Sequence, residues 1–183
     1  TTIDYNHWYS VSVTRSSNNI QLFIDGVAVG SGTYSGDVTF PASVNSYIGR
    51  NWMGDGGYPA NYHFEGIIDE VSLWSESLTQ EEILAYMSSP PSGNEEGLSA
   101  YWKFNAGDGL VLYDHTGNQN HGTINGATWS DDVPTPNYSL SFDGSDDYVD
   151  LANKPITGVQ NQFSILSYFK TNSLSINQGI YFH

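Results

Sequence analysis

The residues of this chain that could do chemistry are mostly oxygen donors, and the densest group lies in one loop. Residues 114–122 read Asp-His-Thr-Gly-Asn-Gln-Asn-His-Gly, so Asp114, Asn118 and Asn120 stand close together between glycines. Carboxylate and amide oxygens suit a hard metal ion. The alternative is an Asx-turn loop in which these side chains bond their own backbone. His115 and His121 leave a transition metal open, although histidines in a polar loop are usually solvated.

A second candidate ligand is Asp69, in an expected strand over residues 67–74. A period of two predicts that Asp69 shares the core face with Ile67, Val71 and Leu73. A carboxylate buried there costs several kcal/mol or more unless it is paired or bound to metal. Asp69 is therefore interpreted either as a metal ligand or as a carboxylate that backbone N–H groups satisfy.

A third group of candidates lies between residues 50 and 63, where aromatic residues alternate with glycine, amides and a carboxylate. Trp52, Tyr58 and Tyr62 offer ring faces for stacking against sugars, and the polar neighbours offer hydrogen bonds to hydroxyl groups. The alternative is that the three rings anchor a long glycine-rich loop against the rest of the protein. The sequence keeps both readings open.

The sequence contains little that resembles a catalytic motif. Retaining glycoside hydrolysis needs two carboxyl groups about 5 Å apart, and in an ideal strand Asp69 and Glu70 point to opposite faces. Glu65 and Asp69 could share a face. The sequence has no Gly-x-Ser-x-Gly motif and no cysteine. We therefore expect a protein that is not an enzyme.

Composition narrows the possible partners. The 183 residues include 20 acidic and 5 basic side chains, and the formal net charge is −15. Such a charge repels phosphate backbones and anionic membrane surfaces, so nucleic acid and membrane insertion are not expected. The negative charge favours the binding of cations, although a solvated acidic surface explains this charge equally well. The absence of cysteine excludes disulfides and Cys-ligated zinc, and the first residues resemble neither a signal peptide nor a natural start, which predicts a processed piece or fragment.

The elements that must position these residues are strands. Alternating apolar residues near 9–13 and 20–24, followed by Asp25-Gly26, predict an antiparallel hairpin. One helix is expected near residues 79–87, because Thr79 and Glu82 form a capping box and Leu78 precedes it. A proline-rich segment, residues 88–97, follows as a linker. The predicted fold class is all-β, an antiparallel jelly-roll sandwich with one short capped helix.

Several stretches together resemble the laminin-G-like, concanavalin A-like jelly-roll family. Residues 97–104, 114–122 and 140–149 are similar to the opening half of such a domain. Residues 7–14, 22–26, 48–50, 64–71 and 78–83 are similar to its closing half. The order is reversed relative to the family: residues 1–87 form the closing half and residues 98–183 the opening half.

Two arrangements fit this reversed order. The halves either fold onto each other as one permuted sandwich, or they exchange strands between neighbouring chains and build a polymer. The family order also places two further strands between the halves, and these are missing here.

The resemblance implies a structural Ca²⁺ near the 114–122 loop, with Asp69, Asp114, Asn118 and Asn120 as ligands. It also implies an extracellular or cell-surface adhesive or structural module of a tandem repeat, with glycans or neighbouring surface proteins as partners. A carbohydrate-binding module that uses Trp52, Tyr58 and Tyr62 is one alternative. A self-assembling filament subunit is the other.

Overall fold

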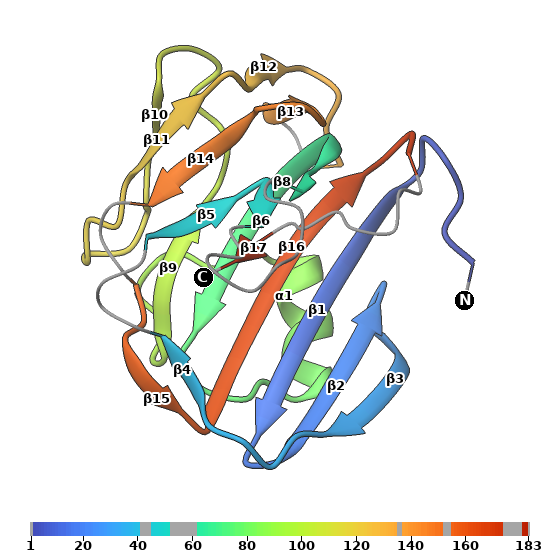
Figure 1. Cartoon of the computed structure of the whole chain (residues 1–183), viewed down its shortest axis with the longest axis vertical. Helices are drawn as coiled ribbons and strands as arrows, with labels where there is room; N and C mark the ends of the chain where they lie inside the picture. The colour runs from blue at the N-terminus through green and yellow to red at the C-terminus, as the bar shows by residue number, and fades with distance from the viewer. Residues whose placement is uncertain are drawn as a thin grey trace.

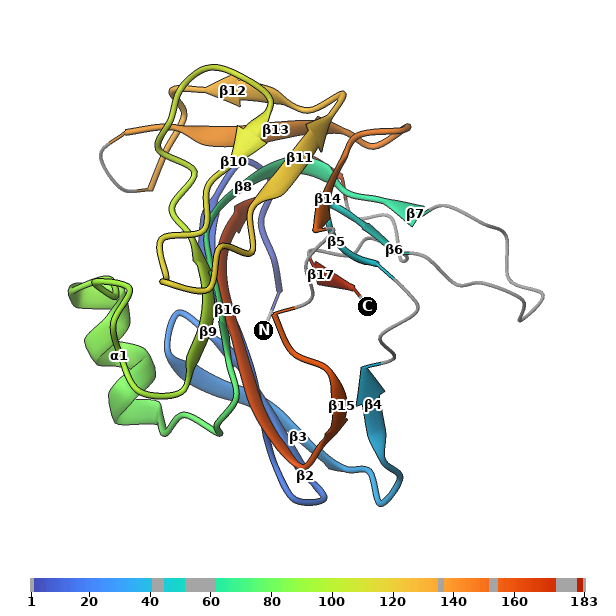
Figure 2. The ribbon, with the colours of Figure 1, turned by 90° about the vertical axis from the view of Figure 1, so that its left-hand side faces the viewer.

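Two antiparallel sheets packed face to face build the molecule (Figures 1 and 2). The computed structural model describes residues 2–40, 45–51, 62–134, 137–151, 155–173 and 181–182. Within these residues the large sheet runs β12-β13-β8-β16-β1-β2-β3, with β9 paired to β8, and the small sheet runs β10-β11-β14-β5-β17. The predicted all-β antiparallel sandwich is therefore confirmed.

The strands have the following bounds. The large sheet contains β1 (Trp8–Ser16), β2 (Asn19–Ile24), β3 (Val27–Thr33), β8 (Glu65–Trp74), β9 (Leu98–Trp102), β12 (Thr128–Ser130), β13 (Ser139–Asp143) and β16 (Gln162–Lys170). The small sheet contains β5 (Ser46–Ile48), β10 (Val111–Leu112), β11 (Gly122–Asn125), β14 (Tyr148–Leu151) and β17 (Tyr181–Phe182). Two short ribbons pair β4 (Val38–Phe40) with β15 (Gly158–Gln160), and β6 (Arg50–Asn51) with β7 (Tyr62–His63).

Strands from both sides of residues 88–97 alternate in these sheets. β8 pairs with β13 and β16, β1 pairs with β16, and β5 pairs with β14. The core between the sheets draws on both segments as well, with Ile48 and Ile68 beside Leu140 and Val149, all fully buried. The two segments thus share one core within one chain, while their origin as halves of successive repeats stays a prediction.

The predicted helix is present as α1 (Gln80–Ser88). Thr79 accepts a hydrogen bond from the Glu82 N–H, and the Glu82 carboxylate accepts one from the Thr79 N–H, which completes the capping box. The helix lies on the outer face of the large sheet, the face turned away from the small sheet (Figure 2). There Ile83 packs with Trp74 and Leu166 in a second apolar cluster.

A β-bulge in β8 overturns one prediction. Glu70 and Val71 together oppose the single residue Ser167, and Glu70 has a φ of 52°. The extra residue shifts the alternation, so that Ile68, Val71 and Leu73 enter the core between the sheets. The expected common face of Ile67, Asp69, Val71 and Leu73 was therefore wrong.

The proline-rich segment is packed against the rest of the chain. Pro91 and Gly93 are buried, and the Glu95 carboxylate accepts hydrogen bonds from the N–H groups of Ser92 and Gly93. A Cβ at Gly93 would collide with the carbonyl oxygen of His115, so the backbone of Gly93 packs directly against the 114–122 loop. Its role as an interdomain linker stays a prediction.

Candidate binding groove

A polar groove opens on the outer face of the large sheet, at the end of β8 away from α1. Cross-strand pairing aligns Ser141, Ile67, Lys170 and Trp8 in one row across β13, β8, β16 and β1. Leu140 and Phe142 point into the core, so their neighbour Ser141 points outward, and the paired residues of the row point the same way. The sheet register thus gathers residues that are far apart in the sequence.

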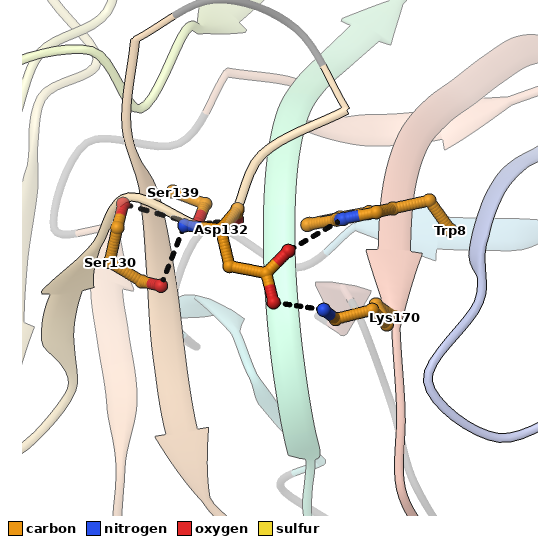
Figure 3. Close-up of polar contacts among 5 residues, drawn as sticks. All are labelled: Trp8, Ser130, Asp132, Ser139 and Lys170. Atoms are coloured by element: carbon orange, nitrogen blue, oxygen red, sulfur yellow. Dashed lines mark hydrogen bonds and ion pairs between the residues drawn. The ribbon is translucent and has the colours of Figure 1, made fainter.

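Asp132 is fixed at the edge of this groove by two side chains (Figure 3). Its Oδ1 accepts a hydrogen bond of 3.1 Å from Nε1 of Trp8, and its Oδ2 forms an ion pair with Nζ of Lys170. The backbone of Asp132 is held as well. The Asp132 N–H donates to Oγ of Ser130, and the Asp132 carbonyl oxygen accepts from Oγ of Ser139. The backbone and the carboxylate of Asp132 are both held in place.

Electrostatics keep this carboxylate charged. The hydrogen bond from Lys170 lowers the pKa of Asp132, with help from the Trp8 indole N–H and against a smaller effect of burial. The Asp132 side chain remains 45% exposed, whereas Lys170 is 15% exposed. Lys170 also lies 5.7 Å from the ring centroid of Trp8. The groove edge therefore presents an ionised, oriented acceptor beside an indole ring.

The groove has a volume of about 260 Å³ and mostly polar walls. Its polar side chains come from six residues besides the Asp132–Lys170 pair: Asn6, Glu65, Ser141, Asp143, Thr171 and Asn172. Three carboxylates against one lysine make it net negative. Such a set can exchange hydrogen bonds with the hydroxyl groups of a neutral ligand and repels an anionic one.

Sequence reasoning missed Trp8, Asp132 and Lys170. Trp8 and Asp132 are 124 residues apart, and their contact depends on the pairing of β1 with β16, which no local pattern reveals. One signal was present, because Trp8 precedes the apolar alternation that begins at Tyr9 and so belongs to the outer face of its strand.

The predicted metal-binding loop is internally hydrogen-bonded. Asp114 Oδ1 accepts from the N–H groups of Tyr101 (3.0 Å) and Thr116 (2.9 Å), and Oδ2 accepts from the N–H of Asn120 (2.8 Å). The side-chain amides of Asn118 and Asn120 both donate to the Ser99 carbonyl. The loop thus has the hydrogen bonds of the Asx-turn alternative, and calcium at these residues stays a prediction.

Asp69 belongs to a different environment from the one predicted. It is fully buried next to the bulge, and its Oδ1 accepts a hydrogen bond from the Glu70 N–H. Its strand partner is Tyr168, which lines a small cavity beneath α1 together with Glu70 and Tyr101. This places Asp69 on the α1 side of the sheet, so its role as a calcium ligand is also an untested prediction.

Another group of carboxylates could hold a metal ion. The ligand oxygens of Asp143, Asp146 and Asp147 lie within 4.8 Å of one another in the hairpin between β13 and β14. Burial raises the pKa of Asp147, and the charges of Asp143 and Asp146 raise it further, against a hydrogen bond from the Asp143 N–H. In the sequence this hairpin falls within the stretch 140–149 that resembles the family, and none of its three carboxylates was predicted as a metal ligand.

Most of the predicted sugar-binding loop lies outside the residues that the structure describes. Trp52 and Tyr58 lie outside the described residues, and Tyr62 is described only as backbone of β7. Their role in ligand binding stays a prediction.

No helix among the described residues is long and apolar enough to cross a membrane.

Comparison with known proteins gives one match. A family profile with the description "Concanavalin A-like lectin/glucanases superfamily" matches residues 1–84. No curated protein and no solved structure matches the chain significantly. The profile match covers β1 to β8 and the start of α1, which together hold the predicted closing half. It supports the resemblance: residues 1–84 of this chain are similar to the laminin-G-like part of the concanavalin A-like lectin/glucanase superfamily.

Proposed function

We propose that this protein is a non-catalytic, lectin-like adhesive module that binds neutral carbohydrate in the groove on the large sheet. The observation that carries the proposal is the ionised Asp132, held between the indole N–H of Trp8 and the ammonium group of Lys170. An oriented acceptor beside an aromatic ring suits a sugar, because the ring packs against C–H groups while the carboxylate accepts from hydroxyl groups.

The same contacts argue against catalysis by Asp132. A general acid in glycoside hydrolysis needs a raised pKa, whereas the contact with Lys170 lowers the pKa of Asp132. Both of its carboxylate oxygens are also engaged with protein groups. The groove is therefore better suited to hold a ligand than to cleave one.

The proposal extends to setting and architecture. Laminin-G-like modules usually act outside the cell, so we place this one on a cell surface or in a secreted protein, as an adhesive or structural repeat. Glycans or neighbouring surface proteins are its partners. Strand exchange into a filament is the less favoured arrangement, because β1, β8 and β16 already pair within one chain.

Binding in the groove is tested by screening neutral oligosaccharides and titrating those that bind by calorimetry. Asp132→Asn removes the charge that holds Lys170, and we expect it to weaken binding at least about tenfold, the size of one charge-assisted hydrogen bond. Trp8→Ala should have a similar effect. Asp131→Asn, at an exposed neighbouring carboxylate, is the matched control.

Two outcomes contradict the groove as the binding site. If Trp52→Ala abolishes binding while Asp132→Asn and Trp8→Ala leave it intact, the ligand binds at the loop predicted from sequence. If no neutral oligosaccharide binds the folded protein, the lectin-like function is wrong.

A structural Ca²⁺ remains part of the proposal, supported by the carboxylate cluster of Asp143, Asp146 and Asp147. We expect the melting temperature to fall when a chelator replaces calcium, and Asp146→Asn to remove this dependence. Asp114→Asn should destabilise the protein with and without calcium alike if Asp114 only binds backbone. If Asp114→Asn alone removes the calcium dependence, the ion belongs to the 114–122 loop. If the melting temperature is the same with and without chelator, the protein has no structural calcium ion.

A further inference from the structure

A small cavity lies beneath α1, which covers part of the outer face of the large sheet (Figure 2). Its volume is about 20 Å³, which is room for about one water molecule. Four strands and the helix meet there. The lining includes Ser10 from β1, Glu70 and Ser72 from β8, Tyr101 from β9, Tyr168 from β16 and Tyr86 from α1.

The hydroxyl group of Ser10 has no partner at this cavity. Ser10 is 3% exposed, and its cross-strand partner Tyr168 also lines the cavity, so both side chains point toward α1. The Ser10 N–H donates to Oδ1 of Asp25, and its carbonyl oxygen accepts from the Asp25 N–H. Within the described part of the chain, no group pairs with the Ser10 hydroxyl. Because a buried hydroxyl group is costly without a partner, this one indicates a ligand in the cavity.

Glu70 brings a carboxylate to the same cavity. Its Oε2 accepts a hydrogen bond from the Tyr101 hydroxyl, and no described basic side chain forms an ion pair with it. Burial raises the pKa of Glu70, and the Tyr101 hydrogen bond and the charge of Lys103 oppose this effect only in part. The ionised carboxylate therefore lacks a countercharge in contact with it.

Three tyrosines around the cavity indicate a negative electrostatic potential. Burial raises the pKa of Tyr86, Tyr101 and Tyr168, and nearby carboxylates raise it further. The largest of these charge effects comes from Glu70 at Tyr101 and Tyr168, and from Glu95 at Tyr86. A negative potential favours a cation, and the faces of tyrosine rings attract cations as well.

The C-terminal end of α1 adds to this potential. Tyr86 and Met87 belong to the last turn of α1 and line the cavity, and this turn contains no basic residue. The Tyr168 hydroxyl donates to the Met87 carbonyl oxygen at 3.4 Å. Carbonyl groups at the C-terminus of a helix carry partial negative charge, which a nearby cation stabilises. The helix end therefore favours the same kind of ligand as the carboxylate.

We propose that this cavity binds one monovalent inorganic cation, K⁺ or Na⁺, with Glu70, Ser10 and Ser72 as oxygen ligands, and that the ion holds α1 on the sheet. The Ser72 hydroxyl accepts from Nε1 of Trp74 at 3.0 Å and keeps a second lone pair for the ion. One carboxylate among neutral oxygens matches a single positive charge, whereas Ca²⁺ takes six to eight oxygen ligands. The site does not depend on carbohydrate binding in the groove.

The test is thermal melting of the whole chain in three salts at equal concentration: potassium chloride, sodium chloride and N-methylglucamine chloride, whose cation is too large for the cavity. Equal ionic strength keeps the screening of surface charges the same, and a chelator removes divalent ions throughout. We expect the melting temperature to be at least about 2 °C higher in the potassium or the sodium salt. The larger increase identifies the preferred ion.

Variants assign this increase to the cavity. Glu70→Gln removes the charge and should abolish the increase, and Ser10→Ala removes one ligand oxygen and should at least halve it. Ser12→Ala is the matched control and should melt with the wild-type increase. Ser12 lies on the same face of β1, is 1% exposed and also has an unpaired hydroxyl, but it does not line the cavity. Circular dichroism shows that each variant is folded.

Equal melting temperatures in the three salts overturn the proposal, and the cavity then holds a water molecule only. The proposal is also wrong if Glu70→Gln keeps the increase, or if Ser12→Ala reduces it as much as Ser10→Ala does. Asp146→Asn should leave the increase unchanged. If Asp146→Asn abolishes it, the cation belongs to the carboxylate cluster of residues 143–147 instead.

Discussion

Asp114 joins three backbone segments through one carboxylate. Tyr101 on β9, Thr116 in the loop and Asn120 near its end all direct N–H groups at its oxygens, and Asp114 is only 6% exposed. Asp114→Ala leaves these buried donors without an acceptor, and each unmet donor costs about 1–3 kcal/mol. We expect the free energy of unfolding in urea to fall by about 3 kcal/mol or more.

Asp108→Ala is the control, because Asp108 is exposed and surface substitutions usually change stability by less than about 0.5 kcal/mol. Equal losses in the two variants contradict the role assigned to Asp114.

Glu70 makes stability depend on pH. Burial raises its pKa, while the hydrogen bond from the Tyr101 hydroxyl and the charge of Lys103 act in the opposite direction. A carboxyl group with a raised pKa in the folded state contributes stability below its ordinary pKa, and this stability is lost as pH rises through the folded-state pKa. We expect Glu70→Gln to gain stability relative to wild type as pH rises, measured by urea unfolding from pH 4 to pH 8.

Other groups also titrate in this range, so the difference between variant and wild type is the informative quantity. Burial raises the pKa of Asp147, and the contact with Lys170 lowers that of Asp132, but neither residue changes in Glu70→Gln. A constant difference across the pH range contradicts the assignment.

Single residues show what the sequence could and could not predict. The composition of the 114–122 loop left two alternatives, metal binding and an Asx-turn, because both use the same oxygens. What separates them is the position of the Tyr101 and Asn120 N–H groups, which depends on tertiary structure. Asp132 gave no local signal at all, since Trp8 and Lys170 reach it only across the sheet.

Among the elements, α1 was the most predictable because its signals are local. Thr79 and Glu82 satisfy each other's backbone N–H groups within one turn. Thr79→Ala removes the cap, and we expect a loss of about 1 kcal/mol in the free energy of unfolding. Thr79→Ser retains the hydroxyl and serves as the control. Similar losses for serine and alanine would show that the methyl group, rather than the cap, matters.

The bulge in β8 was unpredictable for the opposite reason. A period of two describes an ideal strand, and the sequence from Glu65 to Trp74 reads as one. The bulge at Glu70 is defined by the pairing of β8 with Ser167 on β16, and the sequence of β8 alone does not reveal this pairing. It moves Ile68 into the core in place of Ile67 and leaves Asp69 on the side of α1. The error in the predicted face of Asp69 follows from that single insertion.

At the scale of the whole molecule, the two outer faces differ in charge. The groove on the large sheet combines three carboxylates with one lysine, whereas the small sheet presents Arg50 between two tyrosines.

The arrangement of the two segments makes a final prediction. β8 lies between β13 and β16, and β1 pairs with β16, so strands on both sides of residues 88–97 hold each other by backbone hydrogen bonds and a shared core. A protease site inserted at the exposed Asn94 cuts the chain without removing any of these contacts. We expect the two fragments to elute together at the size of the intact 20.1 kDa chain.

Separation of the fragments under native conditions would show that the segments do not form one sandwich. Uncut protein that elutes as a series of larger species would instead indicate strand exchange between chains, because the same β8 and β16 edges can pair between two copies as well as within one. Dilution before cleavage distinguishes the two cases: pairing within one chain is independent of concentration, whereas exchange between chains disappears as the protein is diluted.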